Sequence, residues 1–323
     1  MKTELISWLT GAAFFLASCG DRFPADTEPQ DGNALKLRSV EMADDTYTRA
    51  GGSLGAGTPV NKISVYVTDK NHAALTTDAL SIYELKNGTW SSDTPPSITA
   101  ADQADADQVY AFFPSGGAIT NNGSGNHTIP VQVTADDFSA SLQTDYLYAT
   151  PQAAYAAQRT VSFEMSHALA KVSFNILKSS SVNETLTLSK VEILSGTNRL
   201  QQGTSATMNI NTGKLNGLAS TGSLLMTGST ELKSLQEQPN VSCLVAPMTA
   251  LETKLSFRLS VRVTGEPTDR VFETASVSGT GVQWLPGRHY VYKMTVDKMG
   301  GNLTGIKIDG WKNDANQNTG IGI

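Results

Sequence analysis

The sequence predicts an all-β protein, and three observations support that prediction. Apolar residues alternate with polar ones in many segments of the chain, which is the pattern of half-buried strands. Clusters of Gly, Asn, Ser and Pro separate these segments, as turns between strands do. Segments with helical character are few and short. Many short strands joined by turns favour antiparallel β-sandwiches, and 323 residues leave room for two of them.

The first residues are typical of a secretory signal. Lys2 supplies a positive start, residues 5–16 are mostly apolar, and the run is too short to span a bilayer. It ends on Leu-Ala-Ser-Cys19, which resembles a bacterial lipoprotein box. The resemblance implies cleavage before Cys19 and lipidation of this residue, so that the mature protein is tethered to a membrane. A chance cysteine in an ordinary signal peptide is the alternative.

A single candidate strand follows the tether. Residues 20–33 are polar and contain proline, which indicates a flexible segment. Within Ala34–Val40, Leu35 and Leu37 alternate with charged neighbours, as in a half-buried strand. A second polar and glycine-rich stretch begins at Asp44. The first strand is therefore predicted to be separate from the body of the protein.

Period-two alternation dominates from Lys62 onward. The apolar series are Ile63/Val65/Val67, Ile129/Val131/Val133, Val161/Phe163/Met165, Val172/Phe174/Ile176, Leu255/Phe257/Leu259/Val261/Val263, Tyr290/Tyr292/Met294/Val296 and Ile306/Ile308. Within 186–193 the alternation slips phase between Leu188 and Val191, which predicts a β-bulge. The best helical candidates are Thr99–Ala106 and Pro151–Arg159.

An alanine-rich segment before Arg159 is the predicted boundary between two sandwiches. We therefore expect a signal peptide at residues 1–18 and a tether at 19–50 that contains the first strand and can be removed with it. An N-terminal sandwich at 51–158 and a C-terminal sandwich at 159–323 are expected to follow.

Composition excludes several classes of function. Charged residues make up 17% of the chain, the net charge is −6, and no basic cluster is present, which argues against nucleic acid as a partner. No second apolar stretch is long enough for a membrane helix, so lipid is the only anchor we expect. The other cysteine, Cys243, lies in an apolar run and is predicted to pack in a strand. A lipidated Cys19 leaves it no partner for an intramolecular disulfide.

No catalytic or metal-binding constellation is evident. The four histidines, His72, His127, His167 and His289, are scattered without metal-ligand spacing, and His167 is interpreted as a strand-end or domain-boundary residue. Asp102, Asp105 and Asp107 resemble part of a calcium loop, but the glycine and glutamate of such a loop are missing, which favours a solvated turn. We therefore expect no enzyme activity, no cofactor and no metal. Three tryptophans could stack on sugars if exposed, although core positions are favoured for them: Trp90, Trp284 and Trp311.

Several segments together resemble the fimbrillin family, the subunits and tip proteins of lipoprotein-derived (type V) fimbriae. They are the lipoprotein box at Cys19, Val109-Tyr-Ala-Phe-Phe-Pro114, Asp145-Tyr-Leu-Tyr-Ala149, residues 161–174, Leu244-Val-Ala-Pro247, Trp284-Leu-Pro-Gly-Arg-His-Tyr-Val-Tyr292 and Gly310-Trp311.

The resemblance implies two tandem transthyretin-like β-sandwiches and assembly by strand exchange. In the family, an arginine-specific protease removes the first strand, and a strand from another subunit takes its place. Arg49, followed by Ala50, stands in the matching position, while Arg38 is the competing arginine but lies within the strand pattern. The donor candidates are Leu303–Ile308 and the tail Thr319–Ile323.

The leading hypothesis is a non-enzymatic fimbrial subunit or a tip or accessory adhesin. It implies an outer-membrane lipoprotein precursor that reaches the cell surface and the fimbrium, with other fimbrial subunits, the protease and a host protein or glycan as partners. The alternative hypothesis is a monomeric, lipid-anchored surface protein that binds glycan. An exposed patch of aromatic side chains would favour the alternative.

Overall fold

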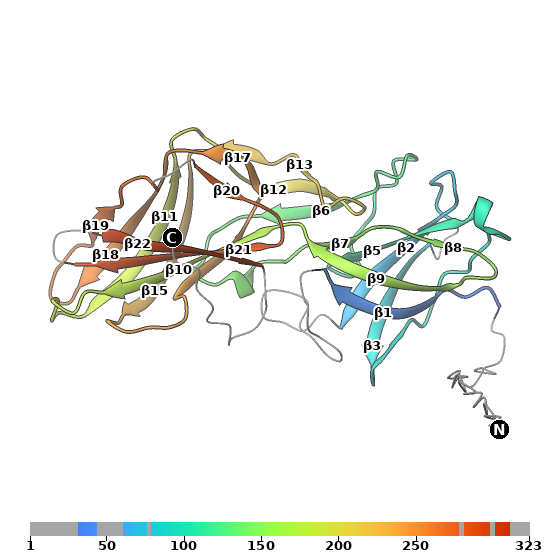
Figure 1. Ribbon diagram of the computed structural model, residues 1–323, viewed down its shortest axis with the longest axis horizontal. Coiled ribbons are helices and arrows are strands. Elements are labelled where there is room, and N and C mark those ends of the chain that lie inside the picture. Colours follow the sequence, from blue (N-terminus) through green and yellow to red (C-terminus); the bar gives the residue numbers. More distant parts are fainter. Residues whose placement is uncertain (1–31, 44–60, 76–78, 278–280, 298–300, 311–323) are drawn as a thin grey trace, which may run out of the picture. The chain divides into compact units, whose positions relative to one another are not determined.

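The computed structural model describes residues 32–43, 61–75, 79–277, 281–297 and 301–310, the last of these from Asn302 onward as backbone only (Figure 1). The chain divides into two compact units, residues 1–32 and 33–323, and every secondary-structure element below belongs to the second. Cys19, Arg49 and Ala50 lie outside the described residues, as do Trp311 and the tail Thr319–Ile323.

The all-β prediction is confirmed for the described residues. They contain strands and two short 3-10 helices, η1 (Gln103–Asp105) and η2 (Ala140–Leu142). Both helical candidates are wrong. Thr99–Ala106 holds only the single turn of η1, and Pro151–Arg159 holds a short strand, β8 (Gln152–Ala154), followed by a turn. A segment this short cannot sustain a helix alone, and pairing of β8 with a neighbouring strand satisfies its backbone instead.

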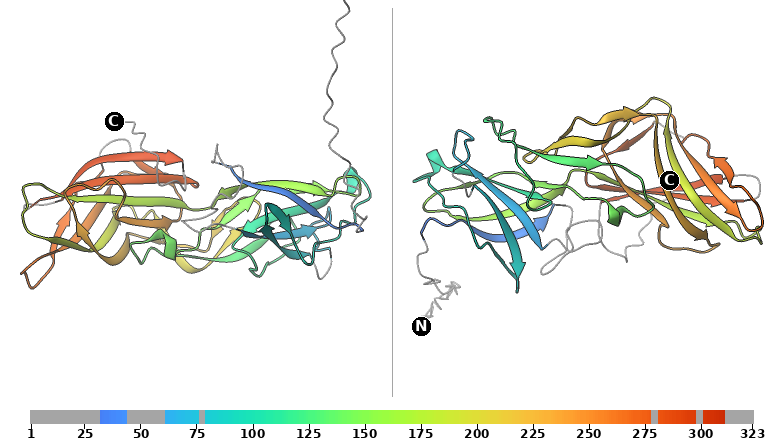
Figure 2. Two further views of the ribbon diagram at one scale, coloured as in Figure 1. Left: turned by 90° about the horizontal axis from the view of Figure 1, so that it is seen from below. Right: turned by 180° about the vertical axis from the view of Figure 1, so that it is seen from behind.

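The first large sheet has eight strands. Seven follow one path in the order β1 (Lys36–Met42), β9 (Thr160–His167), β7 (Leu147–Ala149), β5 (Asp107–Phe113), β2 (Lys62–Thr68), β3 (Leu80–Lys86) and β4 (Thr89–Ser91), and β8 pairs with β5. Most pairs are antiparallel, but β1 runs parallel to β9. Figure 2 shows blue β1 alongside yellow-green β9. One hydrophobic cluster, which includes Val65, Val109 and Phe163, lies against this sheet.

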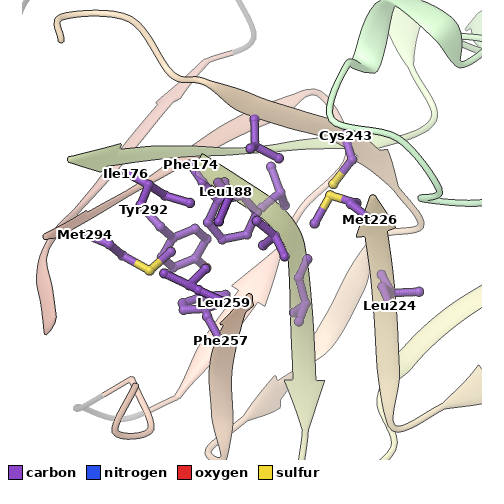
Figure 3. Close-up of a cluster of buried hydrophobic side chains, with 14 of the residues drawn as sticks. Phe174, Ile176, Leu188, Leu224, Met226, Cys243, Phe257, Leu259, Tyr292 and Met294 are labelled. Carbon is purple, nitrogen blue, oxygen red and sulfur yellow. The ribbon is translucent and has the colours of Figure 1, made fainter. Parts of the chain in front are cut away.

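Two four-stranded sheets enclose the largest hydrophobic cluster. Their orders are β16 (Val241–Val245), β10 (Ala170–Lys178), β21 (Arg288–Val296), β22 (Gly301–Gly310), and β15 (Ser223–Leu232), β11 (Leu186–Ser195), β18 (Leu255–Val263), β19 (Arg270–Glu273). Side chains from both sheets meet in the cluster, among them Phe174, Phe257 and Tyr292 (Figure 3). The predicted bulge appears in β11, whose register shifts between Leu188 and Lys190. Strands β10 and β21 form the second parallel pair.

The remaining strands join segments that are far apart in the sequence. β12 (Leu200–Asn209) pairs with β6 (Thr128–Val133), with β13 (Leu215–Asn216) and with β14 (Ala219–Thr221), and β17 (Met248–Glu252) pairs with β20 (Val282–Trp284). A third hydrophobic cluster brings Met208 of β12 together with Ile129 of β6 and Phe112 of β5. Strands on the two sides of the predicted sandwich boundary at 158/159 pair with one another, β7 with β9 and β6 with β12. The position of this boundary therefore stays a prediction.

Candidate functional site: the seat of the first strand

Backbone hydrogen bonds attach β1 to two neighbours, which together we call the β1 seat: strand β9 and residues 96–98. Along β9, Lys36 N donates to Arg159 O and Ala43 N to Met165 O, each at 2.8 Å. On the other side, Leu35 N donates to Pro96 O at 2.8 Å and Ile98 N to Asn33 O at 2.7 Å. Beyond its first residues, β1 pairs only with β9 among the described strands and forms an edge of the sheet as far as the structure describes it.

Apolar side chains of β1, together with Leu35 just before it, complete the hydrophobic cluster of the eight-stranded sheet. Leu35, Leu37 and Met42 are 2%, 6% and 7% exposed, and Val40 is half-buried against the same cluster. Burial of a side chain of this size stabilises a fold by about 1.5–3 kcal/mol. Removal of β1 would therefore uncover apolar surface as well as the backbone groups of β9, and another strand of the same pattern could cover both.

A polar contact also anchors the start of β1. The buried hydroxyl of Tyr83 donates to Leu35 O at 2.8 Å. Burial raises the pKa of Tyr83, so this phenol stays protonated and remains a donor. This contact could not be predicted from the sequence, because the two residues are far apart in the chain.

Replacement of Leu37 by alanine tests how firmly the seat holds β1. We expect the free energy of opening β1 away from the sheet to fall by about 2 kcal/mol. This loss is at the low end for a buried leucine, because an edge strand relaxes readily around the smaller side chain. Amide hydrogen exchange across residues 35–43 should accelerate. Glu41→Ala, an exposed change in the same strand, is the control and should leave the exchange unchanged. Equal exchange in both variants would contradict the assignment of Leu37 to the core.

Two other sheet edges are covered by the chain itself, through residues 134–143. Thr227 N of edge strand β15 donates to Asp136 O at 3.0 Å, and Ser242 N of edge strand β16 donates to Phe138 O at 2.8 Å. The side chain of Gln143 acts as a short piece of strand: its Oε1 accepts from Leu244 N at 2.7 Å and its Nε2 donates to Leu244 O at 2.8 Å. These contacts protect two edges from pairing with another chain.

Replacement of Gln143 by alanine should reopen part of the β16 edge. It removes three hydrogen bonds, two to Leu244 and one from Nε2 to Thr134 O, each worth about 1 kcal/mol, so the free energy of unfolding should fall by about 2–3 kcal/mol. Urea denaturation is the measurement. Gln152→Ala, which removes a longer bond to Thr150 O at an exposed site, should change little. A Gln143 variant as stable as this control would show that the edge does not depend on the side chain.

A third edge is protected by charge. Two ion pairs, Arg258–Glu273 and Arg262–Asp269, link β18 to β19 and to the loop before it, and a third, Arg270–Glu266, joins the start of β19 to the same loop. Charged side chains discourage a second strand from adding there. The fourth edge of these two sheets is β22, which pairs with β21 in antiparallel register from Arg288–Gly310 to Val296–Gly301 and has no second strand partner among the described residues.

The aspartates of the partial calcium loop have separate structural roles. Asp102 Oδ1 accepts from the backbone N of Ala104 and Asp105 and so caps η1. Asp105 pairs with Lys70, and the buried Asp107 accepts from Thr99 N at 2.7 Å. No group of ligating side chains suited to a metal ion occurs among the described residues.

Tryptophan and cysteine take the predicted core positions. Trp90 is 8% exposed, and Trp284 is fully buried with its Nε1 donating to Tyr292 Oη at 2.9 Å. Cys243 is a buried free thiol in β16, and burial raises its pKa to about 12, so it is unreactive at neutral pH. Within the described part of the chain, no Phe, Tyr or Trp side chain is among the exposed large hydrophobic residues.

Two histidines that are far apart in the sequence lie together in the fold. The ring centroids of His72 and His127 are 6.2 Å apart, and the ring of His127 packs edge-on against Tyr66 and Tyr110 at 5.3 and 5.0 Å. His127 is fully buried, and neither of its ring nitrogens has a hydrogen-bond partner among the described residues. Burial, with a smaller contribution from His72, lowers the pKa of His127.

This lowered pKa predicts a loss of stability in acid. The unfolded chain protonates His127 near pH 6.5, whereas the folded chain resists the proton. Stability is therefore fullest above about pH 6.5 and falls as the pH drops below it. His127→Phe keeps an aromatic ring against Tyr66 and Tyr110, and its urea midpoint should change less between about pH 7.5 and about pH 5.

The control for this prediction is His289→Gln. His289 is half-buried and hydrogen-bonds Ser173 Oγ at 2.8 Å, so its loss should leave the pH dependence that depends on His127 in place. Tyr66, Tyr110 and His72 are the titratable groups whose rings pack around His127. A parallel pH response in the wild type and His127→Phe would overturn the prediction.

The described helices were compared with the length and hydropathy that a membrane-spanning helix requires. Among the described residues, no helix is long and apolar enough to cross a bilayer. The residues of the predicted signal and of the lipidation site are outside that part.

The fold and the β1 seat define the chain as a multi-sheet β-sandwich protein with a first strand joined to the body through an edge. Residues 48–311 match the sequence profile of the fimbrillin-like family. The match covers most of the chain, and the protein belongs to the fimbrillin-like family. It begins after β1, so the first strand lies outside the matched region.

Solved structures show the same fold in other proteins. A candidate cell adhesion protein from Bacteroides uniformis ATCC 8492 is 18% identical, with a TM-score of 0.55 over 88% of this chain and 100% of that one. A second candidate cell adhesion protein, from Bacteroides ovatus ATCC 8483, is 19% identical, with a TM-score of 0.56 over 86% and 98%. A fimbrial protein from Bacteroides vulgatus ATCC 8482 is 12% identical, with a TM-score of 0.51 over 86% and 99%. No curated protein is significantly similar in sequence.

Proposed function

We propose that this protein is a structural subunit, or a tip or accessory adhesin, of a fimbrium at the cell surface. The β1 seat is the observation that carries the proposal: an edge strand with buried Leu35, Leu37 and Met42 covers the cluster of the eight-stranded sheet. Membership of the fimbrillin-like family and the likeness to a fimbrial protein support the same role. The work of such a protein is assembly and adhesion, and it requires no catalytic centre.

Assembly would proceed by exchange of strands between subunits. A cut between Arg49 and Ala50 by an arginine-specific protease would separate β1 from the body. Loss of β1 would then expose the edge of β9 and the apolar surface beneath it. A strand from another subunit would add to that edge through backbone hydrogen bonds, and its alternate side chains would fill the positions of Leu35 and Leu37.

The donor that we favour is the segment Leu303–Ile308, which lies in β22. In the described part of the chain this strand is the last of its sheet and has β21 as its one partner, so its departure would not break a central strand. The edges of β15 and β16, by contrast, are covered by residues 134–143. The tail Thr319–Ile323 remains the second candidate.

Delivery would follow the lipoprotein route. A signal peptide over residues 1–18 and lipid on Cys19 would hold the precursor in the outer membrane through the segment that contains β1. A cut after Arg49 would then free the body from the anchor and open the β1 seat in one step. The organisation into two tandem transthyretin-like sandwiches belongs to the same proposal.

Limited proteolysis tests this mechanism. The chain without residues 1–18 and with Cys19→Ser would be treated with an arginine-specific protease. The products would be identified by mass spectrometry and run unboiled on a gel. We expect a cut after Arg49, release of β1 and a ladder of multimers. Arg49→Gln should remain monomeric. Release of β1 without multimers would reject strand exchange, and a monomer that binds glycan would favour the alternative function.

A competing peptide sharpens the test. A synthetic peptide of residues 33–43 should occupy the opened β1 seat and suppress the ladder. The same peptide with Leu35→Asp and Leu37→Asp is the matched control, because it keeps the backbone and loses the buried side chains. Equal suppression by both peptides would contradict the assignment of the β1 seat as the acceptor.

A further inference from the structure

Residues 134–143, which we call the strap, run between the edge strands of two different sheets. Asp136 O accepts from Thr227 N of β15, and only two residues later Phe138 O accepts from Ser242 N of β16. Strands β15 and β16 belong to separate four-stranded sheets. Because one short segment reaches both edges, the strap closes a seam between the two sheets.

The seam lies over the largest hydrophobic cluster. Met226 of β15 and Cys243 of β16 are fully buried members of this cluster (Figure 3). Ala135 of the strap is buried in the same cluster, and the ring of Phe138 packs against it. The strap therefore adds apolar side chains as well as backbone groups to the seam.

A close contact between Phe138 and Gly228 of β15 acts as a latch for the strap. The ring lies so near the backbone of Gly228 that a Cβ atom at this position would overlap it. Carbon atoms that are not bonded attract at about 3.5–4.0 Å and repel strongly when they come much closer. Glycine weakens a strand, because it loses more conformational entropy on folding than other residues do. The contact with Phe138 gives a physical reason for a glycine inside β15.

The strap holds the two edges with few backbone hydrogen bonds. Among the described residues, the bonds to Thr227 and Ser242 are its two backbone–backbone bonds to the edges, and the side chain of Gln143 takes the place of a strand at Leu244. A regular strand would continue the pairing along the whole edge. The strap therefore depends on the latch as well as on hydrogen bonds.

The edge of β16 beneath the strap is suited to pairing with another strand. β16 has the sequence Val-Ser-Cys-Leu-Val, with no charged residue, no proline and no glycine. Uncharged segments of high β-propensity pair with other chains when their edge is open. The N–H of Ser242 and both backbone groups of Leu244 point toward the strap, since it binds them. The edge of β15, by contrast, contains Gly228 and Glu231. β16 is therefore the edge that most needs a cover.

We propose that the strap is autoinhibitory: while it is seated, it prevents this chain from pairing with a second copy of itself through β16. In an antiparallel pair centred on Cys243, Ser242 would lie opposite Leu244 of the second copy. The two strands would then exchange hydrogen bonds through the backbone groups that the strap now binds, in an interface of two-fold symmetry. No charge on β16 opposes such a pair. The inference goes beyond the proposed function and does not rest on it, because neither the β1 seat nor a cut after Arg49 takes part.

Sedimentation velocity of the uncleaved chain tests the proposal, with residues 1–18 removed and Cys19→Ser. Phe138→Ala removes the ring of the latch, and Gly228→Ala displaces it. Each should convert the monomeric wild type into a dimer, with a dissociation constant at least about tenfold below the wild-type value. Gly117→Ala is the matched control, because a Cβ at Gly117 meets no neighbouring atom among the described residues, and it should sediment like the wild type.

Amide hydrogen exchange shows whether the strap has been released. Exchange should accelerate across residues 134–143 and at Thr227, whose N–H donates to the strap, in both latch variants but not in Gly117→Ala. If neither latch variant exchanges faster there, the latch assignment is wrong and the proposal fails. If exchange accelerates but both variants stay monomeric at every concentration, the strap does not guard the edge, and the proposal fails as well.

Proline at position 242 tests whether the dimer forms through β16. The N–H of Ser242 faces the strap, so Ser242→Pro removes a donor from the open edge and leaves the bonds between β16 and β10 in place. The double variant with Gly228→Ala and Ser242→Pro should return to a monomer. A dimer that Ser242→Pro does not weaken, or heterogeneous aggregates in place of a dimer, would overturn pairing through β16. If circular dichroism shows that Gly228→Ala does not fold, Phe138→Ala carries Ser242→Pro instead.

The result is separable from the fimbrial mechanism. Latch variants that dimerise before any cleavage, in a protein that yields no multimers after a cut at Arg49, would uphold the strap and reject the proposed assembly. Latch variants that stay monomeric, in a protein that forms multimers after that cut, would reject the strap and leave the proposed assembly standing.

Discussion

His167→Ala is expected to lower the free energy of unfolding by about 3–5 kcal/mol. His167 is the last residue of β9, and its Nδ1 lies 2.8 Å from Oδ2 of Asp145, just before β7. Both side chains are almost fully buried, at 3% and 2% exposed. Removal of the imidazole would leave the carboxylate of Asp145 in the interior without this hydrogen bond, and an unpaired buried charge is costly.

The surroundings of the pair add to the expected effect. Oδ1 of Asp145 already has no hydrogen-bond partner among the described residues, so the bond to His167 is its side chain's principal polar contact. Lys171, in β10, lies close enough to be affected: burial lowers its pKa, and the charge of Asp145 partly opposes that shift. The pair thus lies where the chain passes from the eight-stranded sheet into the next one.

Urea denaturation of three variants measures this prediction. His167→Ala should be strongly destabilised. The double variant that also carries Asp145→Ala should be no less stable than His167→Ala, because it removes the buried carboxylate that has lost its partner. Lys70→Ala, which breaks the exposed pair with Asp105, should change little. A double variant much weaker than His167→Ala would mean that packing, and not the unpaired charge, determines the loss.

Phe257→Ala is expected to cost about 3–5 kcal/mol. Phe257 belongs to the largest hydrophobic cluster, where side chains of β10, β21, β11 and β18 meet (Figure 3). Its ring centroid is 4.6 Å from that of Tyr292 and 5.2 Å from that of Phe174, and the side chain is fully buried. Alanine would lose the ring contacts and leave a cavity among neighbours that strands hold in place.

The control for Phe257 comes from the adjacent strand. Val271 in β19 is 59% exposed, so Val271→Ala should change the free energy of unfolding by about 0.5 kcal/mol or less. Both proteins would be unfolded in urea and followed by circular dichroism. A loss below about 1 kcal/mol for Phe257→Ala would contradict the close packing of the cluster.

Local pattern was sufficient to predict most individual strands. The series Leu255–Val263 coincides with β18, and its five apolar members are buried as the alternation requires. The phase slip after Leu188 marks a real bulge in β11. These features depend on neighbours in the chain, because period-two alternation records which face of a strand is buried. The short alanine-rich segment 151–159 misled the prediction because β pairing overrode its helical character.

The candidate site was predicted only in part. Leu35 and Leu37 indicated a half-buried first strand, and the structure places both in the core. The parallel partner of that strand, the continuation to Met42 after the bulge and the contact with Tyr83 did not follow from the sequence. Arg49 and Ala50 remain sequence predictions, since they lie outside the described residues.

The sequence alone determined what is local or compositional: an all-β chain of the fimbrillin-like family, a first strand flanked in sequence by polar stretches, and a candidate lipidation site at Cys19. The tertiary structure decided which distant groups meet. It brought Asp145 to His167 and His72 to His127. The physical reason is that strand pairing and burial are chosen by the packing of the whole chain, whereas alternation reports only that a strand has a buried face.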